Sequence, residues 1–342
     1  MKKLITLFLL FTACCSFLIA SDATKVGMKV YQNGGSVLDC GVVDSVKFTT
    51  EEVSSLKESD YVVDGALVKV SYKVSDSKRV YFSQGNLQFN AVRGTHAVYG
   101  STTEKPGTWR FAENQYDYIG DSNKNISQFY NGWIDLYLFG WGTSGWNSGR
   151  KAYQPWATSE VNSDYLHGDL TGSRAVADWG VYNAISNGGD MPNKWRTLTT
   201  EEWQYLFKNN KWTFGYIKPS EEDSILCFML VPETFNAPEG IAVIVISENS
   251  TSSSKTDLTV PATNHYTVEQ FKSLEKLGVV ALPCAGSRYG AEIRSVGSFG
   301  HYWSASIESL SLAMQFNVYD RYVSTFSLDK ASGLSVRLVQ DY

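Results

Sequence analysis

The cysteines of this sequence are its first candidates for covalent or metal chemistry. Of the five, Cys14 and Cys15 lie in an apolar N-terminal stretch, which leaves Cys40, Cys227 and Cys284. An odd set without a close pair cannot form a complete disulfide framework. Cys227 and Cys284 stand in apolar runs, and we therefore predict that both are buried, unreactive thiols.

The histidines and serines do not form a recognisable catalytic pattern either. The four histidines are scattered along the chain and show no metal-ligand spacing. The chain also has no Gly-x-Ser-x-Gly sequence, which presents the nucleophilic serine in many hydrolases. We therefore expect a protein without enzymatic activity.

One short stretch has the spacing of a calcium loop. Oxygen-bearing side chains alternate at Asp121, Asn123 and Asn125, as they do in such loops. Ile126 stands where the loop needs glycine, and glycine replaces its closing glutamate. We expect no cofactor, with calcium at Asp121, Asn123 and Asn125 as the alternative to a plain polar turn.

The C-terminal part of the chain contains the candidate ligand-binding residues. Apolar residues alternate with polar ones from Leu310 to Leu328, which predicts half-buried antiparallel strands. If Leu312, Phe316 and Val318 point inward, the polar residues between them face solvent. The candidates are Glu308, Ser309, Ser311, Gln315, Asn317, Tyr319, Asp320, Arg321, Tyr322 and Ser324. Such a mixture of donors, acceptors and flat aromatic rings is typical of adaptable recognition surfaces.

Several elements must hold this hairpin in place. Thr199 with Glu202, and Thr267 with Gln270, predict two helices that start with capping boxes. A short helix is expected from Asp178 to a stop at Gly188. Apolar runs at 225–231 and 241–246 predict buried strands, and the Gly-rich run 139–146 predicts a loop pinned by its tryptophans. Together these features predict an α+β fold with loop-rich antiparallel sheets and two or three short helices.

Length and composition suggest one large domain after an export signal. Residues 1–21 combine two lysines, an apolar run and a small-residue cleavage site, and a lipoprotein cut before Cys14 or Cys15 is the alternative. We assign residues 22–76 to a small β segment and 77–342 to the main domain. The net charge of −5 and the lack of basic clusters argue against nucleic acid as a partner. No later stretch is long and apolar enough to span a membrane, so only a lipid anchor would attach the chain to one.

Several blocks of the sequence resemble known families. The helix start around residues 196–205 resembles that of the formylglycine-generating (sulfatase-modifying) family, with Thr197-Leu198 in place of its Leu-Pro. The C-terminal blocks resemble the closing signature of Fibrobacter major paralogous domains. The residues that carry both resemblances are Arg196, Thr199, Glu202, Trp203, Tyr302, Trp303, Gly333 and Arg337. Secreted bacterial proteins share the blocks 139–145, 178–189 and 282–290.

These resemblances imply a C-type-lectin-like fold from about residue 80 to Val339. That fold carries unrelated activities, so it does not by itself imply one function. The cysteine pair of the formylglycine-generating enzymes is missing from the C-terminal strands, and so are the calcium-site tripeptides of sugar-binding C-type lectins. We expect an exported, secreted or cell-surface binding module for a glycan or protein ligand. The alternatives are an adhesin subunit of a surface assembly and an extracellular thiol-dependent enzyme.

Overall fold

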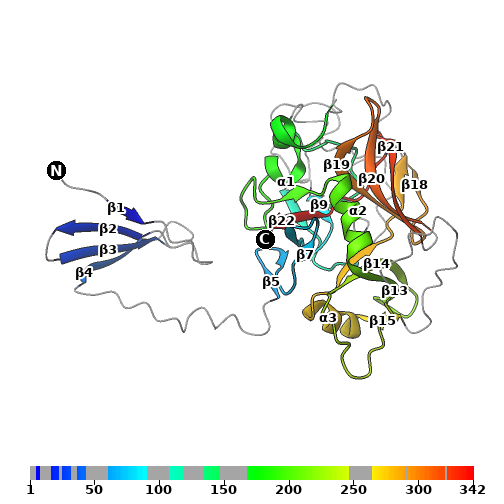
Figure 1. Ribbon diagram of the computed structural model, residues 1–342, viewed down its shortest axis with the longest axis horizontal. Coiled ribbons are helices and arrows are strands. Elements are labelled where there is room, and N and C mark those ends of the chain that lie inside the picture. Colours follow the sequence, from blue (N-terminus) through cyan, green and yellow to red (C-terminus); the bar gives the residue numbers. More distant parts are fainter. Residues whose placement is uncertain are drawn as a thin grey trace. The chain divides into compact units, whose positions relative to one another are not determined.

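The chain forms two compact units, Met1–Glu58 and Ser59–Tyr342, in a computed structural model (Figure 1). In the first unit, the structure describes the backbone of four strands. The second unit is described at residues 61–90, 108–118, 135–146, 168–245, 264–289, 292–319 and 322–342.

The first unit is an antiparallel sheet with its strands in sequence order. Its strands are β1 (Ile5–Leu7), β2 (Phe17–Asp22), β3 (Lys25–Tyr31) and β4 (Val37–Val43). Strand β1 and nearly all of β2 fall within residues 1–21, which the sequence predicts to be an export signal. Removal of that segment therefore stays a prediction.

The larger unit begins earlier than the sequence suggested. Strand β7 (Tyr72–Lys73) pairs with β8 (Arg79–Phe82), so the boundary expected after residue 76 would fall inside this hairpin. The polar residues that resemble a linker form its turn, where the Ser75 hydroxyl oxygen accepts hydrogen bonds from the amides of Ser77 and Lys78. The two units separate between Glu58 and Ser59 instead.

The larger unit is rich in sheet and has few helices, which confirms the α+β class. Its sheets have the orders β5-β6, β10-β9-β11, β12-β22-β8-β7, β15-β13-β14-β16, β17-β18 and β19-β20-β21. The other strands are β5 (Val62–Val63), β6 (Ala66–Leu67), β9 (Leu87–Asn90), β10 (Thr108–Phe111), β11 (Asp135–Leu136), β12 (Arg196–Thr197), β13 (Lys211–Lys218), β14 (Ile225–Val231), β15 (His265–Thr267), β16 (Val280–Pro283), β17 (Ser287–Tyr289), β18 (Glu292–Arg294), β19 (Phe299–Ile307), β20 (Leu312–Tyr319), β21 (Tyr322–Asp329) and β22 (Leu338–Asp341). Apart from the parallel pair β13–β15, these strands pair antiparallel.

The three predicted helix starts are confirmed. Both capping boxes are complete, at α2 (Thr200–Asn209) and α3 (Val268–Lys276). Asp178 caps α1 (Trp179–Tyr182) by accepting a hydrogen bond from the amide of Gly180. This helix is shorter than expected, because the backbone is already extended at Asn183.

The strand predicted at 241–246 is wrong for residues 241–245, and Ile246 lies outside the described residues. The Asn264 side chain binds both backbone groups of Ile244, whose amide donates to Oδ1 at 3.0 Å and whose carbonyl accepts from Nδ2 at 3.0 Å. A side chain therefore takes the place of a neighbouring strand here. The Ile244 side chain is exposed.

The Gly-rich loop 139–146 is pinned by one tryptophan rather than two. Trp141 is fully buried, and its indole N–H donates to the carbonyl of Ser304 at 3.0 Å. Trp146 is 41 % exposed. The first indole therefore belongs to the core, and the second lies on the surface.

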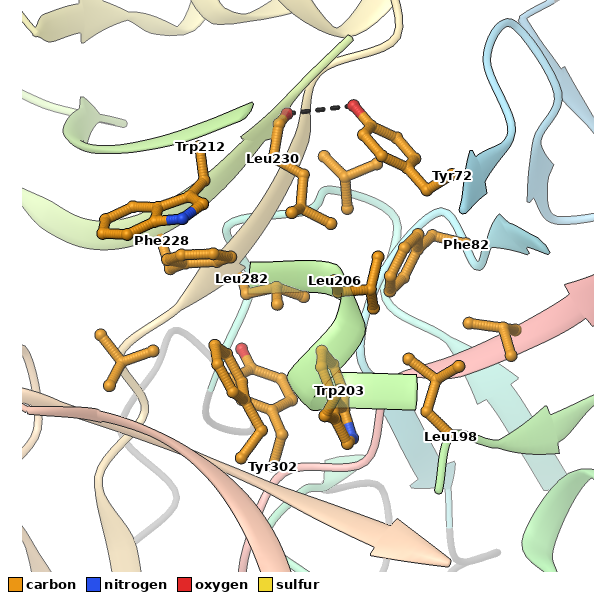
Figure 2. Close-up of a cluster of buried hydrophobic side chains, with 14 of the residues drawn as sticks. Tyr72, Phe82, Leu198, Trp203, Leu206, Trp212, Phe228, Leu230, Leu282 and Tyr302 are labelled. Atoms are coloured by element: carbon orange, nitrogen blue, oxygen red, sulfur yellow. Dashed lines mark hydrogen bonds between the residues drawn. The ribbon is translucent and has the colours of Figure 1, made fainter. Parts of the chain in front are cut away.

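Helix α2 lies at the centre of a large hydrophobic cluster. Trp203 and Leu206 from α2 pack with Tyr302 of β19, Phe82 of β8 and Leu282 of β16 (Figure 2). The hydroxyl of Tyr72 donates to the carbonyl of Leu230, which ties β7 to β14 across the same cluster (Figure 2). The helix thus joins three sheets and fixes the position of β19 and its neighbours.

Candidate functional site

The predicted ligand-binding residues lie on the sheet β19-β20-β21 and its connections. Strands β20 and β21 pair without interruption over eight residue pairs, from Leu312 opposite Asp329 to Tyr319 opposite Tyr322. Strand β19 pairs with the other side of β20, with a shift in register between Trp303 and Ile307. β20 is therefore the central strand of this sheet (Figure 1).

One face of this sheet is covered by α2. The Trp203 ring stacks on Phe316 of β20, with 4.7 Å between ring centroids and 6° between planes. The Gln204 amide of α2 donates to the hydroxyl of Thr325 on β21 at 2.8 Å. Val318 is buried in the same cluster. This face is part of the core and is not available for a ligand.

The opposite face carries a row of polar side chains across three strands. Antiparallel register places Asn317 of β20 opposite both His301 of β19 and Ser324 of β21. Side chains opposite each other in such a sheet share a face, with their Cβ atoms about 5 Å apart. Gln315 and Phe326 form the neighbouring pair on this face.

Two residues of this face were wrongly predicted to point into solvent. Gln315 is 0 % exposed and Asn317 is 4 % exposed. The prediction assumed that a strand with one apolar face has a solvated second face. Both faces of β20 are buried. Phe316 and Val318 pack under α2 on one face, and Ala313, on the same face as Gln315 and Asn317, belongs to a second core cluster. Sequence alternation could not reveal this second covering.

The two buried amides leave part of their hydrogen-bonding capacity unused. The side-chain oxygen of Gln315 lies 3.1 Å from Nδ1 of His301. Nε2 of Gln315 and Oδ1 of Asn317 have no hydrogen-bond partner among the described residues. A donor and an acceptor are thus left open two residues apart on one strand. Buried polar groups of this kind are uncommon in native proteins, and each needs an explanation.

His301 lies between two phenylalanine rings beside these amides. Its ring stacks on Phe299 with 5.8 Å between centroids, and the ring of Phe326 meets it edge-on at 6.5 Å. Burial lowers the pKa of His301 below its ordinary value of 6.5, and the Gln315 hydrogen bond acts against this shift. The imidazole is therefore neutral at pH 7. Phe326 is 39 % exposed, which makes it the accessible apolar surface of this group.

Three of the predicted residues lie at the far end of the sheet. Glu308, Ser309 and Ser311 belong to the connection between β19 and β20, where the Ser309 hydroxyl accepts from the amide of Leu312 at 3.1 Å. The turn between β20 and β21 lies at the other end of β20. Eight residues of strand span about 25 Å. One small ligand cannot contact both groups, and the predicted set does not form one patch.

Other predicted residues lie outside the described ranges or are described by their backbone alone. Asp320 and Arg321 lie outside the described residues, and so do Asp121, Asn123 and Asn125 of the calcium alternative. Tyr319 and Tyr322 are described by their backbone, which forms the last pair of the β20–β21 hairpin.

His301 and Phe326 were not predicted to belong to this group of residues. His301 was treated as one of four scattered histidines, although it lies two residues before Trp303 in the same alternating strand. Phe326 was assigned to the apolar pattern. The pairing of three strands brings these two side chains together, and no local signal specifies that pairing.

The thiols are buried, as predicted. Cys227 and Cys284 are both fully buried free cysteines. Burial raises the pKa of Cys284 from 9.0 to about 12, and it raises the pKa of Cys227 as well. Within the described part of the chain, no three His, Cys, Asp or Glu side chains are grouped as a metal ion would require.

Comparison with protein-family models, curated proteins and solved structures finds no match to this chain. None of the helices in the described ranges is long and apolar enough to cross a membrane.

Proposed function

We propose that this protein is an exported binding module that recognises a glycan through the face of β19-β20-β21 that carries His301, Asn317, Ser324 and Phe326. The observation that carries the proposal is the accessible ring of Phe326 beside the unpaired donor of Gln315 and the unpaired acceptor of Asn317. Because both of these polar atoms are buried, a ligand reaches them only when the side chains that cover them move aside. The export signal predicted at residues 1–21 and the sequence resemblance to C-type-lectin-like proteins favour the same function. Secretion and lipid anchoring both remain compatible with it.

A glycan fits this combination of groups better than a peptide does. A hydroxyl group both donates and accepts hydrogen bonds, so neighbouring hydroxyls can satisfy an amide donor and an amide acceptor together. Ligand sites commonly combine an apolar surface with a few placed polar groups. Ser324 adds a hydroxyl in the same row, and the neutral His301 adds no charge. The site is therefore suited to an uncharged, hydroxyl-rich ligand.

The thiol-dependent enzyme is a weaker alternative. The thiolate is the reactive form of cysteine, and because burial raises the pKa of Cys284 to about 12, this thiol is protonated at pH 7. The sulfur is also fully buried. The other alternative, a subunit of a surface assembly, is favoured by a separate feature, the edge of β21 with which no described strand pairs.

A glycan array of the mature protein, with and without calcium, tests the proposal. The strongest hit is then titrated against Phe326→Ala, which we expect to weaken binding about tenfold, or 1.4 kcal/mol. Tyr289→Ala is the matched control, because Tyr289 is an equally exposed aromatic residue (41 %) on β17. Binding that Phe326→Ala leaves unchanged, or an array without hits, contradicts the proposal.

A further inference from the structure

The strand β21 forms one edge of its sheet. Strand order is β19-β20-β21, so β21 pairs on one side with β20. On its other side, Val323, Thr325 and Ser327 have no backbone partner among the described residues. Every side chain from Val323 to Asp329 is at least partly exposed, so solvent reaches this strand.

The register shows which backbone groups point away from the sheet. The amide of Lys330 donates to the carbonyl of Ser311 at 3.0 Å, which extends the β20–β21 ladder by one pair. Antiparallel pairs alternate between bonded and non-bonded. The bonded residues of β21 are therefore Ser324, Phe326 and Leu328. Val323, Thr325 and Ser327 direct their N–H and C=O groups outward.

Among the described residues, this edge lacks the features that usually protect one. Natural proteins block edge strands with proline, lysine, bulges, short length or a covering segment. β21 has eight residues, an uninterrupted register and no charge between Tyr322 and Leu328. The opposite edge of the sheet is closed within the chain, because the amide of Trp303 on β19 donates to the carbonyl of Ser335. Of the two edges of this sheet, the one formed by β21 is therefore the edge that the described residues leave without a partner.

We propose that β21 pairs antiparallel with β21 of a second copy of this chain, about a two-fold axis at Thr325. The outward residues Val323, Thr325 and Ser327 are symmetric about Thr325. In this register Thr325 lies opposite Thr325 of the second copy, and Val323 lies opposite Ser327. Each bonded antiparallel pair contains two N–H···O bonds, so the three pairs use all six outward groups of each strand.

The side chains are compatible with this pairing. Threonine opposite threonine is a favourable cross-strand pair, and like charges are what such pairs must avoid. The uncharged run from Tyr322 to Leu328 places no like charges opposite each other. Phe326, 39 % exposed in the single chain, comes to lie opposite Ser324 of the second copy. The two three-stranded sheets join into one sheet of six strands.

The test is the oligomeric state of the mature protein, measured by analytical ultracentrifugation over a concentration series. The wild type should sediment at twice the monomer mass. Thr325→Lys and Thr325→Glu, which place like charges at the axis, should each sediment as monomers. Because Thr325 also accepts a hydrogen bond from Gln204 of α2, both variants should melt somewhat below the wild type, and circular dichroism should show that each is still folded. An equimolar mixture of the two variants should dimerise, because opposite charges then meet at Thr325.

A second pair of variants separates loss of pairing from loss of folding. Ser327→Pro removes one outward N–H without breaking a bond to β20, and it should yield a folded monomer. Ser327→Ala keeps that N–H and should remain a dimer. A monomeric wild type overturns the proposal, and an extended segment of a different protein would then be the candidate partner of this edge. A dimer that persists in every variant overturns it as well. Neither result depends on whether the protein binds a glycan.

Discussion

At the scale of single residues, an amide side chain bridges a buried cation and a buried carboxylate. Arg337 is fully buried and donates to the side-chain oxygen of Gln115 at 3.0 Å. The amide nitrogen of Gln115 donates in turn to Glu275 at 3.0 Å. Burial lowers the pKa of Arg337 from 12.5 to about 10, so the guanidinium remains charged at pH 7. Gln115 thus links the buried guanidinium of Arg337 to the buried carboxylate of Glu275 through its own amide group.

Gln115→Leu should therefore destabilise the protein more than the loss of ordinary hydrogen bonds. Leucine has a similar volume but leaves Arg337 and Glu275 without their shared partner, and breaking such a buried arrangement costs about 3 kcal/mol. Denaturant unfolding monitored by fluorescence would measure the change. A loss below about 1 kcal/mol, the net worth of one hydrogen bond, would show that Arg337 has found another partner.

A second buried charge should make stability depend on pH. Burial raises the pKa of Asp178 from 3.8 to about 6, against the lowering effect of the amides of Thr197 and Gly180 that donate to it. The folded state therefore binds a proton more readily than the unfolded chain between these two values. Lowering the pH from 7 to 5 should stabilise the wild type relative to Asp178→Asn by about 1 kcal/mol. If the free energy of unfolding changes with pH by the same amount in both proteins, the raised pKa of Asp178 is contradicted.

At the scale of elements, α2 owes its place to one buried indole. Trp203 is 1 % exposed, stacks on Phe316 of β20 and packs against Tyr302 of β19. Trp203→Ala should lower the free energy of unfolding by about 3–5 kcal/mol, as the loss of a large buried side chain does. The control is Trp146→Ala, since Trp146 is exposed and its loss should cost less than about 0.5 kcal/mol. Equal melting temperatures for the two variants would show that α2 does not hold the sheet.

Local signals predicted the helix starts, whereas the faces of β20 needed the tertiary structure. The capping boxes at Thr199 and Thr267 are encoded within four residues, and both are present. The burial of Gln315 and Asn317 depends on what packs against the second face of β20. Alternation in sequence shows that two faces differ in polarity, but it does not show that one of them is solvated. Polar residues on a covered face therefore escaped prediction.

At the scale of the whole molecule, composition predicted a sheet-rich α+β chain, and this is confirmed. The domain boundary was misplaced because the turn at 75–78 has the composition of a linker. A turn and a linker are told apart by what pairs on either side, and here Tyr72 pairs with Val80. The sheet of β19, β20 and β21 could be foreseen as a hairpin, while the position of β21 at its edge follows only from the order of the described strands.

The pairing of β22 with β8 and β12 determines when the larger unit can fold. β22 consists of residues 338–341, almost the last of the chain, and Val339 lies opposite Phe82. At roughly 5–20 residues per second, β8 is synthesised about 10 to 50 s before its partner exists. Val80 and Phe82, which are buried in the folded protein, have no β22 to pair with during that interval. The sheet of β12, β22, β8 and β7 can therefore be completed only after residue 341 has been synthesised.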